Sequence, residues 1–191
     1  MNSKPVRRPH AQVRNTSRAC LVIFVAALPL FFTACSTYAP QAGSPTAKLR
    51  MITDDGNLTT FWLMPDPSSC PEAREKIAQL WDLFPGQKSE LKMIGTAAEA
   101  NQRIAEKVIE AGRPFVMEVG SGITPGPYTP GYHCDARFSF VPQAKGEYEI
   151  KYSFKDHKCG INLTRLVDTG APNFRREFVP LQRVEKTCFK R

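Results

Sequence analysis

The sequence lacks the short motifs that mark several common catalytic sites. It contains neither Gly-x-Ser-x-Gly, which exposes a nucleophilic serine, nor His-Glu-x-x-His, which binds a catalytic zinc ion. Histidine is also scarce, with three among 191 residues. A covalent mechanism needs a serine or cysteine beside a positioned base, and no such pair can be recognised. We therefore expect a protein that is not an enzyme and that uses no cofactor.

Acidic residues are absent from the first 18 positions, whereas five cations occur there. An apolar run follows from Ala19 to Phe32, and small residues then lead to Cys35. This run is shorter than the roughly 20 apolar residues that a membrane-spanning helix needs. A basic start, a short apolar segment and a small-residue exit are typical of a secretory signal peptide. We expect residues 1–34 to be this signal peptide.

Cys35 and the threonine and alanine before it resemble the lipobox of bacterial lipoproteins. The resemblance implies that Cys35 carries acyl chains such as palmitate and becomes the first residue after cleavage. Several acyl chains would anchor the protein stably to a membrane. Ser36 stands where an aspartate would signal retention in the inner membrane, so the resemblance implies the periplasmic face of the outer membrane. We expect a flexible tether over residues 35–48 and one domain over residues 49–191.

The formal charge of the whole chain, +8, does not describe the mature protein. Five of the cations lie in the signal peptide, and their removal lowers the charge to +3. Such a mild charge gives no reason to expect nucleic acid as a partner. The segment from Phe174 to Arg191 has a local charge of +4. It could contact anionic lipid headgroups or simply form a solvated edge.

Cysteine use fits an oxidising compartment. With Cys35 assigned to lipid, four cysteines remain in the mature chain: Cys70, Cys134, Cys159 and Cys188. Four cysteines allow three pairings. Cys134 and Cys159 occupy the apolar parity of two predicted strands, so we predict that they form a disulfide. We predict a second disulfide between Cys70 and Cys188, which would join the C-terminal tail to the first part of the domain.

Alternation of apolar and polar residues predicts that most of the domain is β-strand. The predicted strands are 49–53 and 58–64, joined as a hairpin, a short strand 91–94, strands from about 105 and from 115, an antiparallel meander over 134–140, 148–154 and 159–163, and a final edge strand over 178–184. The Gly/Pro-rich stretch 120–131 is predicted to be a long loop. Apolar residues at helical spacing predict a helix over 70–83, and residues 97–111 fit either a helix or a strand.

Three stretches resemble a family of small secreted or lipid-anchored proteobacterial proteins: Trp62 to Cys70, Ala111 to Phe115, and Cys134 to Ile150. The resemblance implies an immunoglobulin-like sandwich and brings no catalytic residues with it. Several short strands and few helices are also typical of a sandwich. We therefore expect a mainly β protein, an immunoglobulin-like antiparallel β-sandwich with one or two short helices.

The loop over 120–131 is one candidate for a binding site. It presents Ile123 and Tyr128, and Tyr132 follows just beyond it. Binding residues are often placed on loops of rigid scaffolds, and aromatic side chains are frequent anchors at interfaces. The alternative is a simple connection between strands.

A metal site is the alternative assignment for the two histidines of the mature chain. His133 and His157 lie next to or near Cys134 and Cys159, and two histidines with two cysteines could bind zinc or copper. Adjacent residues of a strand point to opposite faces of the sheet. This geometry favours the disulfide over the metal site.

These observations together predict a lipid-anchored binding or envelope-assembly module without catalytic activity, with a protein of the cell envelope as its partner. A periplasmic enzyme inhibitor is the alternative. The positive charge of the mature chain argues against an inhibitor of a basic enzyme, because complementary charges favour association.

Overall fold

The computed structural model describes residues 38–54, 56, 58–68, 73–81, 91–95, 103–123, 131–156, 158–170 and 173–185. All of them belong to the second of two units, Met1–Ser36 and Thr37–Arg191, into which the chain divides. The strands are β1 (Thr46–Thr53), β2 (Leu58–Leu63), β3 (Glu75–Leu80), β4 (Arg103–Glu110), β5 (Phe115–Ile123), β6 (Tyr132–Phe140), β7 (Glu147–Lys155), β8 (Lys158–Asp168), β9 (Phe174–Phe178) and β10 (Gln182–Arg183). No helix occurs within these described ranges.

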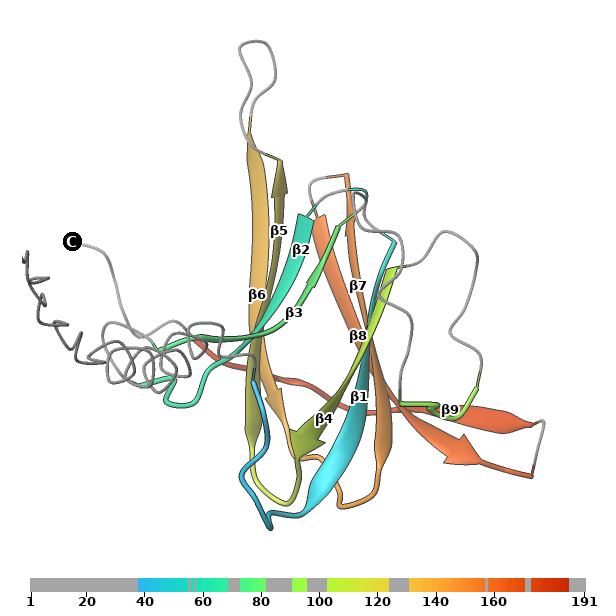
Figure 1. Cartoon of the computed structure of the whole chain (residues 1–191). Coiled ribbons are helices and arrows are strands. Elements are labelled where there is room, and N and C mark those ends of the chain that lie inside the picture. Colours follow the sequence, from blue (N-terminus) through green and yellow to red (C-terminus); the bar gives the residue numbers. More distant parts are fainter. Residues whose placement is uncertain are drawn as a thin grey trace, which may run out of the picture. The chain divides into compact units, whose positions relative to one another are not determined.

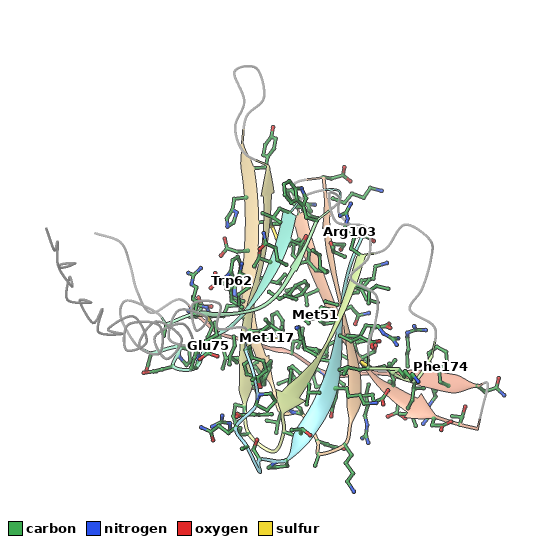
Figure 2. All side chains as sticks on the ribbon, viewed as in Figure 1. Met51, Trp62, Glu75, Arg103, Met117 and Phe174 are labelled. Carbon is green, nitrogen blue, oxygen red and sulfur yellow. A yellow bond between two sulfur atoms is a disulfide. The ribbon has the colours of Figure 1, made fainter. Side chains whose placement is uncertain are left out.

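The strands form two five-stranded sheets that enclose the hydrophobic core (Figure 1). Sheet A has the order β4-β1-β7-β8-β9, and sheet B has the order β10-β6-β5-β2-β3. Met51 of β1 and Met117 of β5, both labelled in Figure 2, are fully buried in this core. Two sheets packed over one core confirm the predicted mainly β fold, a β-sandwich.

Part of the strand order follows the immunoglobulin pattern. In sheet B the order β6-β5-β2-β3 matches strands G-F-C-C′, and in sheet A the neighbours β1 and β4 match strands B and E. The last strands depart from this pattern. β7 lies beside β1 but runs parallel to it, and β7, β8 and β9 continue as an antiparallel meander. The fold is therefore an immunoglobulin-like sandwich whose sheet A is extended by the C-terminal strands.

The predicted hairpin of the first two strands is wrong, although both strands exist. β1 pairs with β4 and β7, whereas β2 pairs with β3 and β5. The chain crosses between the sheets after Thr53, whose hydroxyl oxygen lies 3.4 Å from that of Thr59. A turn sequence specifies a reversal of the chain, but not whether the next strand pairs with the previous one. The predicted three-strand meander is wrong in its first pairing for the same reason, because β6 belongs to sheet B and β7 to sheet A. Its second pairing is confirmed, because β7 and β8 are antiparallel neighbours.

The predicted helix over 70–83 is wrong wherever it can be compared, because its described core is strand β3. A β-bulge explains the error. Opposite Phe61 and Trp62 the register shifts by one residue, and Ile77 is the extra residue. Ile77 and Leu80 then both face the core. Their spacing of three residues resembles one face of a helix rather than a strand.

The predicted loop over 120–131 is wrong in its first part. β5 continues through Gly120 and Gly122 to Ile123 and is a central strand of sheet B. The connection over 124–130 lies outside the described residues. Glycine inside a strand often marks a place where other groups approach the backbone closely. Side chains of neighbouring strands approach both glycines of β5 in this way.

The structure also differs from the predicted tether over residues 35–48. β1 already begins at Thr46, and Tyr38 packs against the core. The Tyr38 ring lies edge-on to Phe115, with ring centres 5.8 Å apart, and its backbone N donates to the carbonyl oxygen of Lys76 at 3.4 Å. One aromatic side chain thus fixes a segment whose small, polar composition is typical of a linker.

Three further boundaries can be compared. The predicted short strand 91–94 is wrong, because residues 91–95 adopt no regular structure. The open alternative over 97–111 is a strand where it is described, since β4 occupies its C-terminal part. The predicted final strand over 178–184 is interrupted by Pro180, which separates β9 from β10. Each of these two strands lies at the edge of a sheet, where a proline is tolerated.

Candidate functional site

The structure brings together two of the three residues predicted for the binding loop. Ile123 ends β5 and lies directly opposite Tyr132, the first residue of β6. Tyr128 lies outside the described residues. The predicted loop is therefore the connection of a β-hairpin whose two strands are both interior to sheet B, which gives it a rigid base.

The predicted disulfide between Cys134 and Cys159 is present, with the two Cα atoms 6.0 Å apart. It joins β6 of sheet B to β8 of sheet A, and so links the two layers. The hydroxyl of Tyr152 donates a hydrogen bond to the carbonyl oxygen of Cys134 at 3.0 Å. The other predicted pair, Cys70 and Cys188, lies outside the described residues.

The disulfide takes both thiols that the alternative metal site would need. His133 projects from the opposite face of β6, where its Nε2 lies 3.0 Å from Oδ1 of Asp135. His157 lies outside the described residues. Within the part of the chain that the structure describes, no group of three or more His, Cys, Asp or Glu residues is arranged to hold a metal ion.

A cluster that the sequence analysis missed lies on the outer face of sheet B. Trp62 of β2, Glu118 of β5 and Arg137 of β6 form one row across three neighbouring strands. Charged residues before β3 and along β6 surround this row. We call the whole cluster the Trp62 face and define it as Trp62, Arg74, Glu118, His133, Asp135 and Arg137.

The centre of the Trp62 face is a buried ion pair. Arg137 donates to Oε2 of Glu118 through Nε at 3.0 Å and through Nη2 at 2.6 Å, and both side chains are almost fully buried. The other carboxylate oxygen of Glu118 lies 3.0 Å from Nη1 of Arg74. Buried charges persist only when they are paired and hydrogen-bonded. The cluster is therefore held in one geometry.

Partly exposed groups surround this pair. The side chain of Arg74 is 40% exposed, and its guanidinium lies 5.9 Å from the ring centre of Trp62, within range of a cation–π interaction. The side chain of His133 is 66% exposed and is oriented by Asp135. An aromatic ring and a guanidinium at the surface of a rigid sheet are the groups that most often dominate binding energy at protein interfaces.

Two glycines on the middle strand shape the same face. Gly120 and Gly122 occupy outward positions of β5. A Cβ atom on Gly122 would lie 3.0 Å from Nδ1 of His133, and one on Gly120 would lie 3.4 Å from Cζ3 of Trp62. The two rings therefore lean over strand positions that carry no side chain. The glycines set how close the rings come to the sheet.

The sequence contains only part of the signal for this face. Glu118 and Arg137 each stand between apolar neighbours, so a period of two places them on the polar side of their strands. They lie opposite each other because β5 pairs with β6. This pairing was not predicted, because residues 120–131 were expected to be a long loop. Arg74 lies within the segment 70–83 that was predicted as helix, so its position next to Trp62 could not be foreseen.

A second charged cluster lies on the outer face of sheet A. Arg50 is fully buried, with Nε 2.9 Å from Glu106 Oε1 and Nη1 3.2 Å from Glu149 Oε2. The same guanidinium donates to backbone carbonyl oxygens of the irregular segment 91–95 at distances between 3.1 and 3.4 Å. This cluster fastens that segment to the sheet, and its role in the fold is structural.

Neither a scan against protein-family models nor a search of the curated proteins finds a match to this chain. None of the described residues forms a helix long and apolar enough to cross a membrane. The lipidation candidate Cys35 lies outside the described residues. The function must therefore be argued from the geometry of the Trp62 face and from the sequence pattern at the N-terminus.

Proposed function

We propose that this protein is a lipid-anchored binding module on the periplasmic face of the outer membrane, without catalytic activity of its own, and that its partner is a protein of the cell envelope. The observation that supports this proposal best is the row of Trp62, Glu118 and Arg137 on the outer face of sheet B. The proposed contact surface is the Trp62 face.

The composition of the Trp62 face fits a protein partner. Tryptophan and arginine are enriched among residues that dominate binding at interfaces, and Trp62 and Arg74 lie in contact range of each other. Glu118 already holds Arg74 and Arg137 in place. Binding would then immobilise few additional side chains, which lowers the entropic cost of association.

The N-terminal pattern supports the proposed location. Acylation of Cys35 would confine the domain to a membrane surface, where its partner is met at a high local concentration. Replacement of Cys35 by alanine tests this part of the proposal: incorporation of radiolabelled palmitate should be lost. Labelling that persists in Cys35→Ala would contradict the assigned anchor.

The contact surface can be tested with the full-length protein in its own envelope. Chemical cross-linking followed by affinity purification should recover a partner with the wild type, and Trp62→Ala should reduce that recovery several-fold. Trp81→Ala is the matched control, because Trp81 is 42% exposed and follows β3 outside the Trp62 face. Equal recovery with both variants would contradict the proposed surface. Thermal melting of each variant identifies any loss of recovery that comes from unfolding.

A further inference from the structure

The chain joins the domain very close to the proposed lipid. Tyr38 is fixed by its contact with Phe115 and by the amide of Glu110, which donates to the Tyr38 hydroxyl at 3.0 Å. Cys35 precedes Tyr38 by only three residues, and three residues span at most about 11 Å when fully extended. If Cys35 is acylated, as the proposed function states, the domain cannot move far from the membrane.

The Tyr38 side chain reaches Phe115 and Glu110 at one end of the sandwich, and we call this the proximal end. It consists of residues 41–45, 111–114 and 141–146, which backbone hydrogen bonds connect to one another and to the start of β1. Ala111 N donates to Pro45 O at 2.8 Å, and Lys145 N donates to Thr46 O at 2.7 Å. The three segments therefore form one continuous surface.

The topology places other features at the opposite, distal end. β1, β5 and β7 begin at the proximal end, whereas β4 and β6 end there. The nine residues of β5 span about 30 Å, which is more than twice the reach of the three residues before Tyr38. Leu58, at the start of β2, and the paired residues Ile123 and Tyr132 lie at the distal end.

The proximal end has the chemistry of a surface that meets lipid headgroups. Its three segments contain two cations, Arg113 and Lys145, and no carboxylate. Arg165 of β8 adds a third cation, which donates to the side-chain oxygen of Gln143 at 2.7 Å. Arg113 is paired with Glu110 of β4. Val141 is 55% exposed among these groups, so an apolar side chain lies within a basic rim.

The described part of the other basic segment, residues 174–185, is less suited to this role. In its described part, Arg175 pairs with Glu177, Arg176 with Glu149, and Arg183 with Glu185. Of the six cations that give this segment its local charge of +4, these three therefore have carboxylate partners, and Lys186, Lys190 and Arg191 lie outside the described residues. Lys145 and Arg165 have no carboxylate among their described contacts.

We propose that the proximal end rests on the anionic headgroups of the membrane that carries the lipid anchor. Val141 then lies at the headgroup boundary, and Lys145 and Arg165 face the lipid phosphates. The distal end, with Leu58 and the stem of the β5–β6 hairpin, points away from the membrane. This inference rests on the proposed acylation of Cys35.

Photo-cross-linking on vesicles tests this orientation. The full-length acylated protein, with p-benzoylphenylalanine in place of Val141, is reconstituted in vesicles of phosphatidylcholine and phosphatidylglycerol. The same label in place of Leu58, which is 37% exposed, is the distal control. Lipid adducts should form several-fold more often from position 141 than from position 58. A label at Ala144, also exposed at the proximal end, replaces the first if the Val141 variant melts early.

A variant that lacks one cation tests whether positive charge contributes to the contact with lipid. Lys145 has a positive φ of 63°, which asparagine tolerates well, so Lys145→Asn removes the charge without straining the turn. It should lower adduct formation from position 141 on vesicles with phosphatidylglycerol, and not on phosphatidylcholine alone. Equal adducts from both ends in an acylated protein would overturn the orientation and leave the proposed function standing. Absence of acyl label on the wild type would overturn both.

Discussion

Arg137 and Glu118 lie directly opposite each other on β6 and β5, and two guanidinium nitrogens donate to the same carboxylate oxygen. Both side chains are almost fully buried. Truncation of one partner would leave the other charge buried with incomplete pairing, which costs about 3 to 5 kcal/mol in comparable cases. The pair therefore contributes rigidity to the Trp62 face even though its net contribution to stability, relative to an apolar pair, is small.

The first prediction concerns this pair. Arg137→Ala should lower the free energy of unfolding by about 3 kcal/mol, measured by urea denaturation. Arg175→Ala is the control, because Arg175 and Glu177 form an exposed pair, and exposed pairs contribute at most about 1 kcal/mol. A loss below about 1 kcal/mol for Arg137→Ala would show that the pair does not organise the face.

The second prediction uses the two glycines of β5. A methyl group on Gly122 would meet the carbonyl oxygen of Tyr132 and Nδ1 of His133, each at 3.0 Å, and the backbone oxygen cannot move aside easily. Gly122→Ala should therefore cost about 1 to 3 kcal/mol. At Gly120 the nearest atom is at 3.4 Å, an ordinary contact. Gly120→Ala should be neutral or stabilise by up to about 1 kcal/mol, because alanine restricts the unfolded chain.

The urea denaturation midpoints of the two glycine variants test this prediction. The order of stability should be Gly120→Ala above Gly122→Ala. A Gly122→Ala protein as stable as the wild type would contradict the close approach of the Tyr132 carbonyl oxygen to β5 at this position. A fall in partner recovery with Gly122→Ala at unchanged stability would indicate that the position of His133 matters for binding.

Local periodicity predicted most strands of this protein correctly, because the burial of alternate residues is a local property. The alternation of Tyr148, Ile150 and Tyr152 in β7 and the shared parity of Cys134 and Cys159 both survive in the structure. These residues are placed by the pleat of a single strand. The mainly β fold and the inner disulfide follow from them.

The assignments that failed depend on pairing between strands, which no single segment encodes. The extra residue Ile77 changes the apolar spacing of β3 only because β3 pairs with β2. Gly120 and Gly122 are acceptable in a central strand only because Trp62 and His133 cover them. The Trp62 face is likewise a product of register, so the sequence does not reveal its residues as a group.

The third prediction is a pH dependence at Tyr38. Burial raises the pKa of Tyr38 from 10.0 to about 12, although Arg113 lowers it and Glu75 raises it further. Because the folded pKa lies above the unfolded value, the folded state holds this proton more tightly. The contribution to stability is complete below about pH 10 and is lost as the pH rises from 10 to 12. Wild-type stability should therefore fall more steeply in this window than that of Tyr38→Phe.

Tyr38→Phe also provides a comparison at neutral pH. The Tyr38 hydroxyl accepts a hydrogen bond from the amide of Glu110 at 3.0 Å, and its loss should cost about 1 kcal/mol at pH 7. The difference between the two proteins should then shrink at high pH. Parallel curves of urea midpoint against pH for the two proteins would contradict the burial of this hydroxyl.

The last prediction concerns the disulfide that joins the two sheets. Cys134 and Cys159 are separated by 25 residues, and closing a loop of this length contributes about 3 to 4 kcal/mol on the chain-entropy model. The variant with both cysteines replaced by serine should unfold at a correspondingly lower urea concentration. Tyr152→Phe, which removes only the hydrogen bond to the Cys134 carbonyl, should cost about 1 kcal/mol and shows how much of the effect belongs to that bond.

Peptide mapping without reduction checks the pairing directly and also tests the predicted Cys70–Cys188 bridge. Recovery of Cys134 or Cys159 as a free thiol from protein of an oxidising compartment would contradict the disulfide and reopen the assignment of His133.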